Sequence, residues 1–148
     1  MKTRFLAAAA LTAATAACGM GRRPAAAATE KTPMSIMEWK GQYGGPSEPG
    51  SVVANDQAAW QRAWKQVGKE APPLDFAQFV GVMVFVGEKP TGGWTVAFDA
   101  PLAQGDDVLL RYRVPKPGGF TTQAFAQPWK AHAFPRPKGR VIVEAASE

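Results

Sequence analysis

The chain has 148 residues, a length that suits one domain rather than two, and its formal net charge at pH 7 is +5. Lys2 and Arg4 belong to a predicted leader, and without them the net charge falls to about +3, a mild excess that does not indicate a nucleic-acid partner. The chain contains one cysteine and one histidine. A single cysteine excludes an internal disulfide. One cysteine and one histidine also cannot form a zinc site of the ordinary type, which needs several such ligands.

The chain begins with a pattern that predicts export. Basic residues precede an apolar, alanine-rich run over residues 5–17, which has the length of a signal peptide's hydrophobic region and is too short for a membrane-spanning helix. The small residues before Cys18 resemble a bacterial lipobox, with Thr15 standing where such motifs usually have leucine. We therefore predict a lipoprotein-type signal peptide over residues 1–18, with Cys18 as the site of lipidation.

The leader also predicts where the protein resides. Gly19 follows the cysteine in place of an aspartate retention signal, so the resemblance implies a lipid anchor in the cell envelope, on the outer-membrane or periplasmic side. The alternative is later cleavage, near Ala28, which would discard Cys18. Residues 19–35 show no apolar periodicity, so we predict a disordered tether there, followed by a single domain over residues 36–148.

One helix is well marked in the sequence. Asn55 or Asp56 can cap its N-terminus, apolar side chains then follow at helical spacing, and Gly68 stands where a glycine commonly ends a helix. Trp60 and Trp64 lie four residues apart, so they share one face. We expect both to pack the helix against a sheet, rather than to form an exposed aromatic surface.

The stretch from 79 to 98 organises the rest of the domain. Residues 79–87 are apolar at nearly every position, which predicts a strand buried on both faces. Residues 94–98 alternate in the manner of a strand with one face in water. Pro90 and two glycines lie between these runs, so the pattern predicts a β-hairpin at the centre of a sheet, with residues 88–93 as its exposed tip.

The remaining strands are predicted from alternation and turns. We expect a first strand within residues 36–43, a strand over 108–114, an extended segment over 121–125, an edge strand over 128–134 because of its prolines, and a last strand at 141–143 that closes the sheet. One helix followed by a run of strands predicts an α+β fold, with a small antiparallel β-sheet and one packed α-helix.

The sequence offers little for catalysis. A nucleophile needs a nearby base, and His132 could serve only if Ser47 or Ser51 folded over it. The Arg111-Tyr-Arg113 run could line a basic patch, but alternating arginines on a strand are more typical of a solvated face. We therefore predict a protein that is not an enzyme and has no cofactor, no metal and no nucleic-acid partner.

Two segments carry a family resemblance. Gly87-Glu-Lys-Pro-Thr-Gly-Gly-Trp-Thr-Val96 closely resembles the G-x-x-P-T-G-G-Y-x-V signature of the PrcB C-terminal domain family, and Thr121-Thr-Gln-Ala-Phe-Ala-Gln-Pro-Trp129 resembles its later segment. Trp94 and Trp129 stand where the family favours tyrosine. The family is named for a lipoprotein subunit of a secreted subtilisin-like protease complex, in which that subunit supports the stability of its protease partners.

This resemblance implies a membrane-anchored domain that binds or stabilises a protein partner, for which a secreted protease is a candidate. The expected partner-binding residues are the hairpin tip and a later Pro-Trp pair: Lys89, Pro90, Thr91, Gly92, Gly93, Trp94, Pro128 and Trp129. Turn chemistry alone also explains the glycines and the proline of the tip, because glycine permits a positive φ and proline fixes the entry to a turn.

A second similarity is to the chagasin-type inhibitors of cysteine proteases, which fill the active-site cleft with three loops. Residues 89–94, 117–120 and 127–129 resemble the three inhibitory motifs in the same order, with substitutions in the first and the third. A protease inhibitor is therefore the alternative function. It requires the three segments to meet at one end of the sheet, and hence an irregular segment rather than a strand over residues 120–127.

Overall fold

The computed structural model describes residues 36–146. The predicted signal peptide, the lipidation site Cys18 and the tether over residues 19–35 lie outside the described residues. No helix in the described part of the chain is long and apolar enough to cross a membrane.

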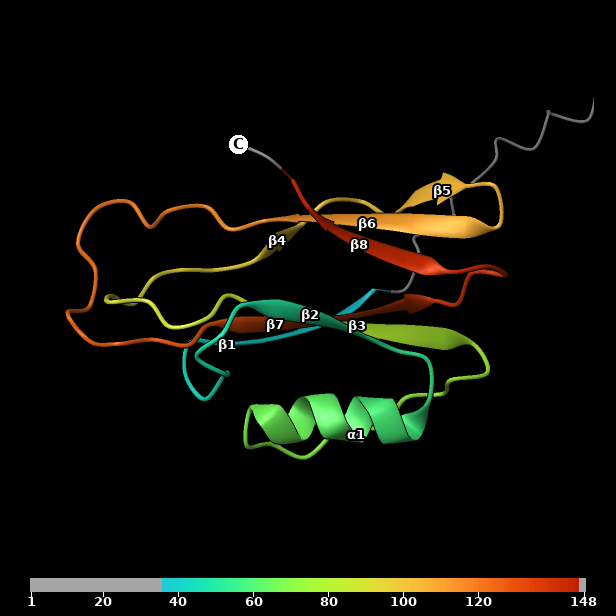
Figure 1. Cartoon of the computed structure of the whole chain (residues 1–148), viewed down its shortest axis with the longest axis horizontal. Helices are drawn as coiled ribbons and strands as arrows, with labels where there is room; N and C mark the ends of the chain where they lie inside the picture. Colours follow the sequence, from blue (N-terminus) through green and yellow to red (C-terminus); the bar gives the residue numbers. More distant parts are fainter. Residues whose placement is uncertain (1–35, 147–148) are drawn as a thin grey trace, which may run out of the picture. The chain divides into compact units, whose positions relative to one another are not determined.

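The described residues form three layers, namely one α-helix, a four-stranded sheet and a second sheet (Figure 1). The helix is α1 (Gln57–Gln66). The first sheet is antiparallel, and its strands lie in the order β1 (Met37–Gly41), β7 (Trp129–Pro135), β3 (Phe79–Phe85) and β2 (Gly50–Ala54). The second sheet is built around β6 (Asp107–Arg113), which pairs with β4 (Ala97–Phe98), with β5 (Leu102–Gln104) and, in parallel, with β8 (Val141–Ala145).

Helix α1 forms where its caps and its apolar spacing predict it. Asp56 is the N-cap, and its Oδ1 accepts a hydrogen bond from the Ala59 N–H at 2.7 Å. Gly68, at φ +68°, takes the left-handed conformation that ends many helices. Trp60 and Trp64 are 0% and 4% exposed, so the prediction that they pack the helix against a sheet is confirmed.

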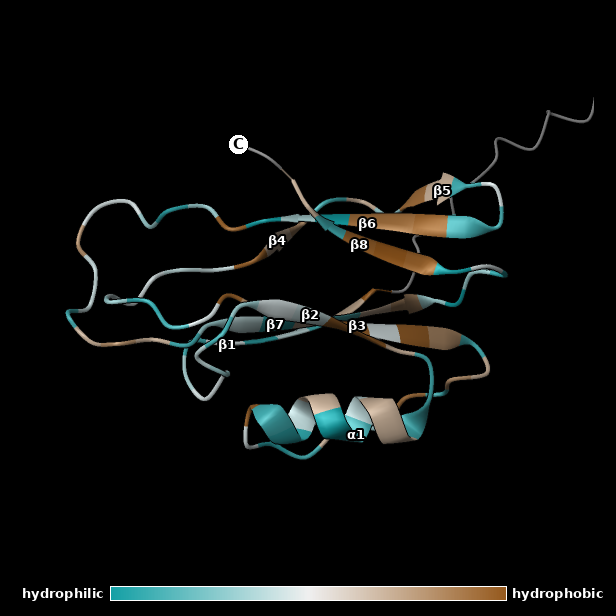
Figure 2. Ribbon diagram, in the orientation of Figure 1, coloured by the Kyte–Doolittle hydropathy of each residue, from teal (hydrophilic) through white to brown (hydrophobic). Residues whose placement is uncertain are grey.

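Strand β3 is buried on both faces, as its continuous apolar sequence predicts. Met83 and Phe85 pack in the core beneath α1, whereas Val80, Val82 and Val84 pack in the core toward the second sheet. Figure 2 shows the apolar residues of β3, β6 and β8 and the polar residues along α1. The first sheet is therefore the central layer, and it supports one core on each face.

The predicted hairpin between residues 79–87 and 94–98 is wrong. β3 pairs with β2 and β7, whereas only Ala97 and Phe98 form a strand, and that strand pairs with β6 in the second sheet. The chain after β3 thus crosses from one sheet to the other. The alternation has a physical basis nonetheless, because Val96 and Phe98 pack into the core between the sheets.

Two further strands differ from their predictions. The sequence predicts an edge strand over residues 128–134, but β7 lies between β1 and β3. Its prolines are compatible with a central position because Pro128 precedes the strand and Pro135 is its last residue. The strand predicted at 141–143 does not close the first sheet, since β8 pairs with β6. The predicted α+β class is confirmed, with two small sheets in place of one.

Candidate functional site

Three connecting segments gather at one end of the two sheets, which we call the loop end (Figure 1). The entry loop comprises residues 42–49 between β1 and β2. The tip loop comprises residues 86–96 between β3 and β4, and it contains the predicted partner-binding residues 89–94. The long loop comprises residues 114–128 between β6 and β7.

Backbone hydrogen bonds join the tip loop to the long loop. Lys89 and Ala126 form an isolated β-bridge, in which each N–H donates to the other residue's carbonyl, at 2.8 and 2.9 Å. The N–H of the buried Gly92 donates to the Thr122 carbonyl at 2.9 Å. These bonds restrain the tip loop at two separate positions along its backbone.

Gln42, at the start of the entry loop, connects the other two loops. Its side-chain amide donates to the Trp94 carbonyl at 2.7 Å and accepts from the Gly93 N–H at 3.2 Å. Its backbone carbonyl accepts from the Gln127 N–H at 3.0 Å. One residue thus satisfies polar groups of both loops and holds them in one arrangement. The sequence prediction missed Gln42, because nothing local marks a side chain whose partners lie 51 and 52 positions away.

The side chains of the tip loop also contact one another. The Lys89 Nζ lies 4.9 Å from the centroid of the Trp94 ring, a cation–π contact. The Trp94 indole N–H donates to the Thr91 Oγ1 at 3.3 Å. Gly93, at φ +85°, holds a conformation that other residues rarely adopt. Pro90 and Gly93 are exposed and Trp94 is half-buried, so the tip presents a defined surface to solvent.

Pro128 and Trp129 lie beneath the loop end rather than on its surface. Pro128 is fully buried, and Trp129 is 3% exposed. The Trp129 indole N–H donates to the Tyr43 carbonyl at 3.1 Å, and its ring centroid lies 5.4 Å from that of Trp64 in α1. The predicted set is therefore divided: the tip residues lie on the loop end, whereas Pro128 and Trp129 are buried beneath it, and Trp129 connects the entry loop to the helix.

The long loop forms no strand over residues 120–127, and its only pairing there is the bridge at Ala126. The segment over 121–125, which we expected to be extended, therefore adds no strand to either sheet. Its irregular path lets the long loop lie against the tip loop, where a Cβ added to Gly93 would be 3.1 Å from the Pro117 Cβ. The geometry that the inhibitor alternative requires for this segment is present.

Three aromatic side chains of the loop end are exposed. Phe120 and Phe125 in the long loop are 109% and 68% exposed, and Tyr43 in the entry loop is 55% exposed. The sequence prediction included Phe120 in the second inhibitory motif, over residues 117–120, and did not single out Phe125. The signal that marks Phe120 is the Pro117-Gly-Gly run before it, which interrupts the strand pattern and indicates a loop.

His132 does not form a catalytic pair with Ser47 or Ser51, the two serines considered for that role. It is 2% exposed, and neither ring nitrogen has a hydrogen-bond partner among the described residues, which include Ser47 and Ser51. Its ring centroid lies 4.7 Å from that of Phe98. Burial lowers the pKa of His132 below its usual value of 6.5. Residues 36–146 also contain no group of three or more His, Cys, Asp or Glu side chains that could hold a metal ion.

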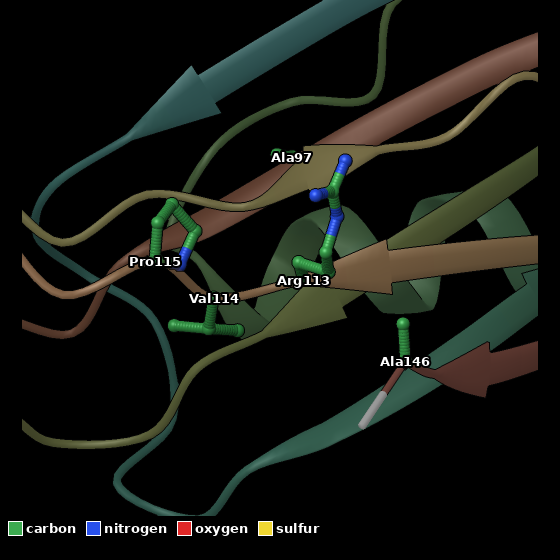
Figure 3. Close-up of a pocket in the computed structure, with 5 residues that line it drawn as sticks. All are labelled: Ala97, Arg113, Val114, Pro115 and Ala146. Carbon is green, nitrogen blue, oxygen red and sulfur yellow. The ribbon is translucent and has the colours of Figure 1, made fainter. Parts of the chain in front are cut away.

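A hollow of about 350 Å³ lies beside the start of the long loop (Figure 3). The residues that line it are Ala97, Arg113, Val114, Pro115 and Ala146. Arg113 is the one charged member of this lining, and its guanidinium already pairs with Asp99 at 2.8 Å. Because that charge is compensated, the lining offers no ionic group for a ligand, and we do not assign one.

Two of the three loops of the loop end, the tip loop and the long loop, fall within a stretch that is similar to a known family. Residues 81–135 match the family model described as PrcB C-terminal, so the resemblance predicted from the tip-loop and long-loop motifs is confirmed. The match begins within β3 and ends with β7, and it includes the whole of the tip loop and the long loop. No curated protein and no solved structure matches the chain.

Proposed function

From the PrcB C-terminal match over residues 81–135, we propose that this protein is a non-enzymatic lipoprotein of the cell envelope whose loop end binds and stabilises a protein partner. A secreted protease is the partner class that the family resemblance favours. A lipid on Cys18 anchors the domain. The contact surface comprises the surface residues of the tip loop: Lys89, Pro90, Thr91, Gly93 and Trp94.

The observation that carries the proposal is that the tip loop is exposed and yet braced. The long loop holds its backbone at Lys89 and Gly92, and Gln42 holds it at Gly93 and Trp94. A loop that is ordered before binding loses less conformational entropy when it binds. Exposed loops on a rigid scaffold are also the usual place for recognition. Both properties support a contact with a partner at this position.

Affinity purification of the full chain from solubilised membranes tests the proposal. Lys89→Glu reverses a charge on the tip and removes the contact with Trp94, so we expect it to lower recovery of the partner by roughly tenfold or more. Lys138→Glu is the matched control, because Lys138 is an exposed lysine in the connection after the far end of β7. Equal recovery by both variants would place the contact elsewhere, and recovery of no partner under several growth conditions would count against the function itself.

The second candidate function is inhibition of a protease. The observation that favours it is the contact between the long loop and the tip loop, which places residues 89–94 beside residues 117–120. Trp129 is buried, so an inhibitory wedge here would consist of two loops instead of three. Assays against papain-like and subtilisin-like proteases separate the candidates: inhibition supports this one, and recovery of a partner without inhibition supports the first.

The lipid anchor has a test of its own. Cys18→Ala removes the thiol that acylation would use, so we expect the protein to leave the membrane fraction. Stable attachment needs more than one acyl chain, and the resemblance to bacterial lipoproteins implies that the mature protein carries more than one. If Cys18→Ala still sediments with membranes, the anchor is not at this residue.

A further inference from the structure

The long loop places two phenylalanines in solvent. Phe120 is 109% exposed and Phe125 is 68% exposed, so the described residues give Phe120 no cover beyond that of an isolated peptide. Phenylalanine is among the residues most often buried in folded proteins. Two exposed phenylalanines on one loop therefore indicate a contact surface for something apolar.

The segment that carries these side chains is restrained. Ala126, which follows Phe125, forms the β-bridge with Lys89. The Thr122 carbonyl, two residues after Phe120, accepts a hydrogen bond from the tip loop. Phe120 and Phe125 thus project from a braced part of the loop, which lowers the entropy cost of placing them in an apolar environment.

The charge on this part of the surface is basic. No Asp or Glu occurs between residues 108 and 143, a stretch that contains the whole long loop. Lys116 on the long loop and Lys89 on the tip loop form no ion pair with the described residues. The acidic residues of the loop end, Glu48 and Glu88, belong to the other two loops, and the Glu88 carboxylate accepts a hydrogen bond from the Gln127 amide at 3.2 Å.

We propose that the long loop is a lipid-contact site, in which Phe120 and Phe125 enter the boundary between headgroups and acyl chains of a bilayer that contains anionic lipids. Exposed aromatic side chains beside basic ones are typical of interfacial membrane contacts. Lys116, which lies on the long loop itself, would face the anionic headgroups, which attract cationic side chains near the membrane surface.

The arrangement of the loop end favours a bilayer over a groove in a protein. The long loop reaches farther from the two sheets than the tip loop does (Figure 1), so a broad surface can meet it without first meeting the tip loop. The polar tip loop remains available to a protein partner. The lipid contact therefore depends neither on the proposed partner nor on the proposed anchor at Cys18.

A fluorescent label at the loop tests the proposal in the full chain. Cys18→Ala removes the only cysteine, and Phe125→Cys then provides a single thiol for an environment-sensitive fluorophore while Phe120 stays in place. We expect the label's emission to shift to the blue on vesicles of phosphatidylcholine mixed with phosphatidylglycerol, and lipids with spin labels on their acyl chains to quench it. Phe120→Ala should raise the lipid concentration needed for insertion about tenfold, the effect of one buried aromatic side chain.

Leu102→Cys, in the same Cys18→Ala background, is the matched control. Leu102 is a 48% exposed apolar residue on β5 and lies outside the loop end, so its label should stay in water even if the leader itself holds the protein on the vesicles. Equal shifts at both positions, or no shift at position 125 on vesicles that carry the protein, would overturn the proposal. If a recovered protein partner shields the label at position 125 and vesicles do not, the loop binds protein, and the lipid site is wrong while the proposed function stands.

Discussion

The two faces of the first sheet are built in different ways. On the helix face, Trp39, Trp60, Trp64 and Trp129 form a chain of edge-to-face contacts, with ring centroids 5.4 to 5.8 Å apart. On the other face, the valines of β3 pack against Leu110 and its neighbours in the second sheet. The helix face is thus a core of few, large and directional contacts, whereas the other face is a core of many small aliphatic ones.

The faces also differ in how their polar atoms are placed. The indole N–H groups of Trp60 and Trp129 donate to the carbonyls of Pro72 and Tyr43, at 3.0 and 3.1 Å, which ties the helix face to the loops around it. The Trp64 indole N–H, on the same face, is buried without a partner among the described residues, but it does not titrate. The other face contains His132, whose two ring nitrogens have no partner among the described residues. The helix face therefore holds the loop end in place, while the other face contains the group that responds to pH.

The largest expected effect comes from removing the centre of the helix face. Trp60→Ala deletes a side chain that is 0% exposed and leaves a cavity between α1 and the first sheet, so we expect it to lower the free energy of unfolding by about 3–5 kcal/mol. Urea denaturation followed by circular dichroism measures this change. Gln61→Ala, at an exposed position of the same helix, should change stability by less than about 0.5 kcal/mol. A loss below about 1 kcal/mol for Trp60→Ala would mean that this face of the helix is exposed to solvent rather than packed against the sheet.

A smaller effect is expected from overfilling the same face. A Cβ added to Gly81 of β3 would lie 2.5 Å from the Trp60 Cζ3, so Gly81→Ala should lower the free energy of unfolding by roughly 1–3 kcal/mol. Gly50→Ala on β2 is the matched control, because nothing lies within 4 Å of its added Cβ. Equal stability of the two variants would show that the indole can move, and the helix face would then be less rigid than its edge-to-face contacts imply.

These two faces also explain which parts of the fold could be predicted from the sequence. Helix α1 is specified within a short window by Asp56, the spacing of its tryptophans and Gly68. The double burial of β3 follows from its unbroken apolar run. In both cases the determining chemistry lies in the element itself, so no knowledge of distant residues is needed.

Strand pairing could not be predicted in the same way, because distant segments decide it. The run after β3 has the alternation of a hairpin partner, but its inward residues, Val96 and Phe98, face β3 from the opposite sheet. Alternation tells which side chains are buried and does not tell which strand lies beside them. The parallel pairing of β8 with β6 depends on equally distant contacts.

In the candidate site, too, the residues that a local motif marks could be predicted, and those defined by distant contacts could not. The tip loop could be found because its proline and glycines form a local motif. Gln42 could not be found in this way, because its hydrogen-bond partners lie in the tip loop, which is separated from it in the sequence by β2, α1 and β3. Trp129 was expected on a contact surface because a motif resemblance records residue types and contains no information on burial.

The smallest expected effect concerns the face toward the second sheet and depends on pH. Burial between Phe98 and Phe134 lowers the pKa of His132 from its usual 6.5, while Glu38 opposes that shift and Lys130 adds to it. The unfolded chain therefore binds this proton at a higher pH than the folded chain does. The contribution of neutral His132 to the free energy of unfolding is therefore fully present above about pH 6.5 and is lost as the pH falls below that value. The loss is at most about 1.4 kcal/mol per pH unit, because a single proton is bound.

His132→Leu separates this group from the other acids and bases. The variant cannot bind the proton, so its free energy of unfolding should stay level over the first pH unit below about 6.5, where the parent chain loses stability. Denaturation series in urea at matched pH values measure the difference between the two slopes. Because both chains carry the same carboxylates, the difference between the two slopes isolates the contribution of His132. If the parent chain shows no slope there, the folded protein accommodates the imidazolium, and the face toward the second sheet would then contain no group that responds to pH in this window.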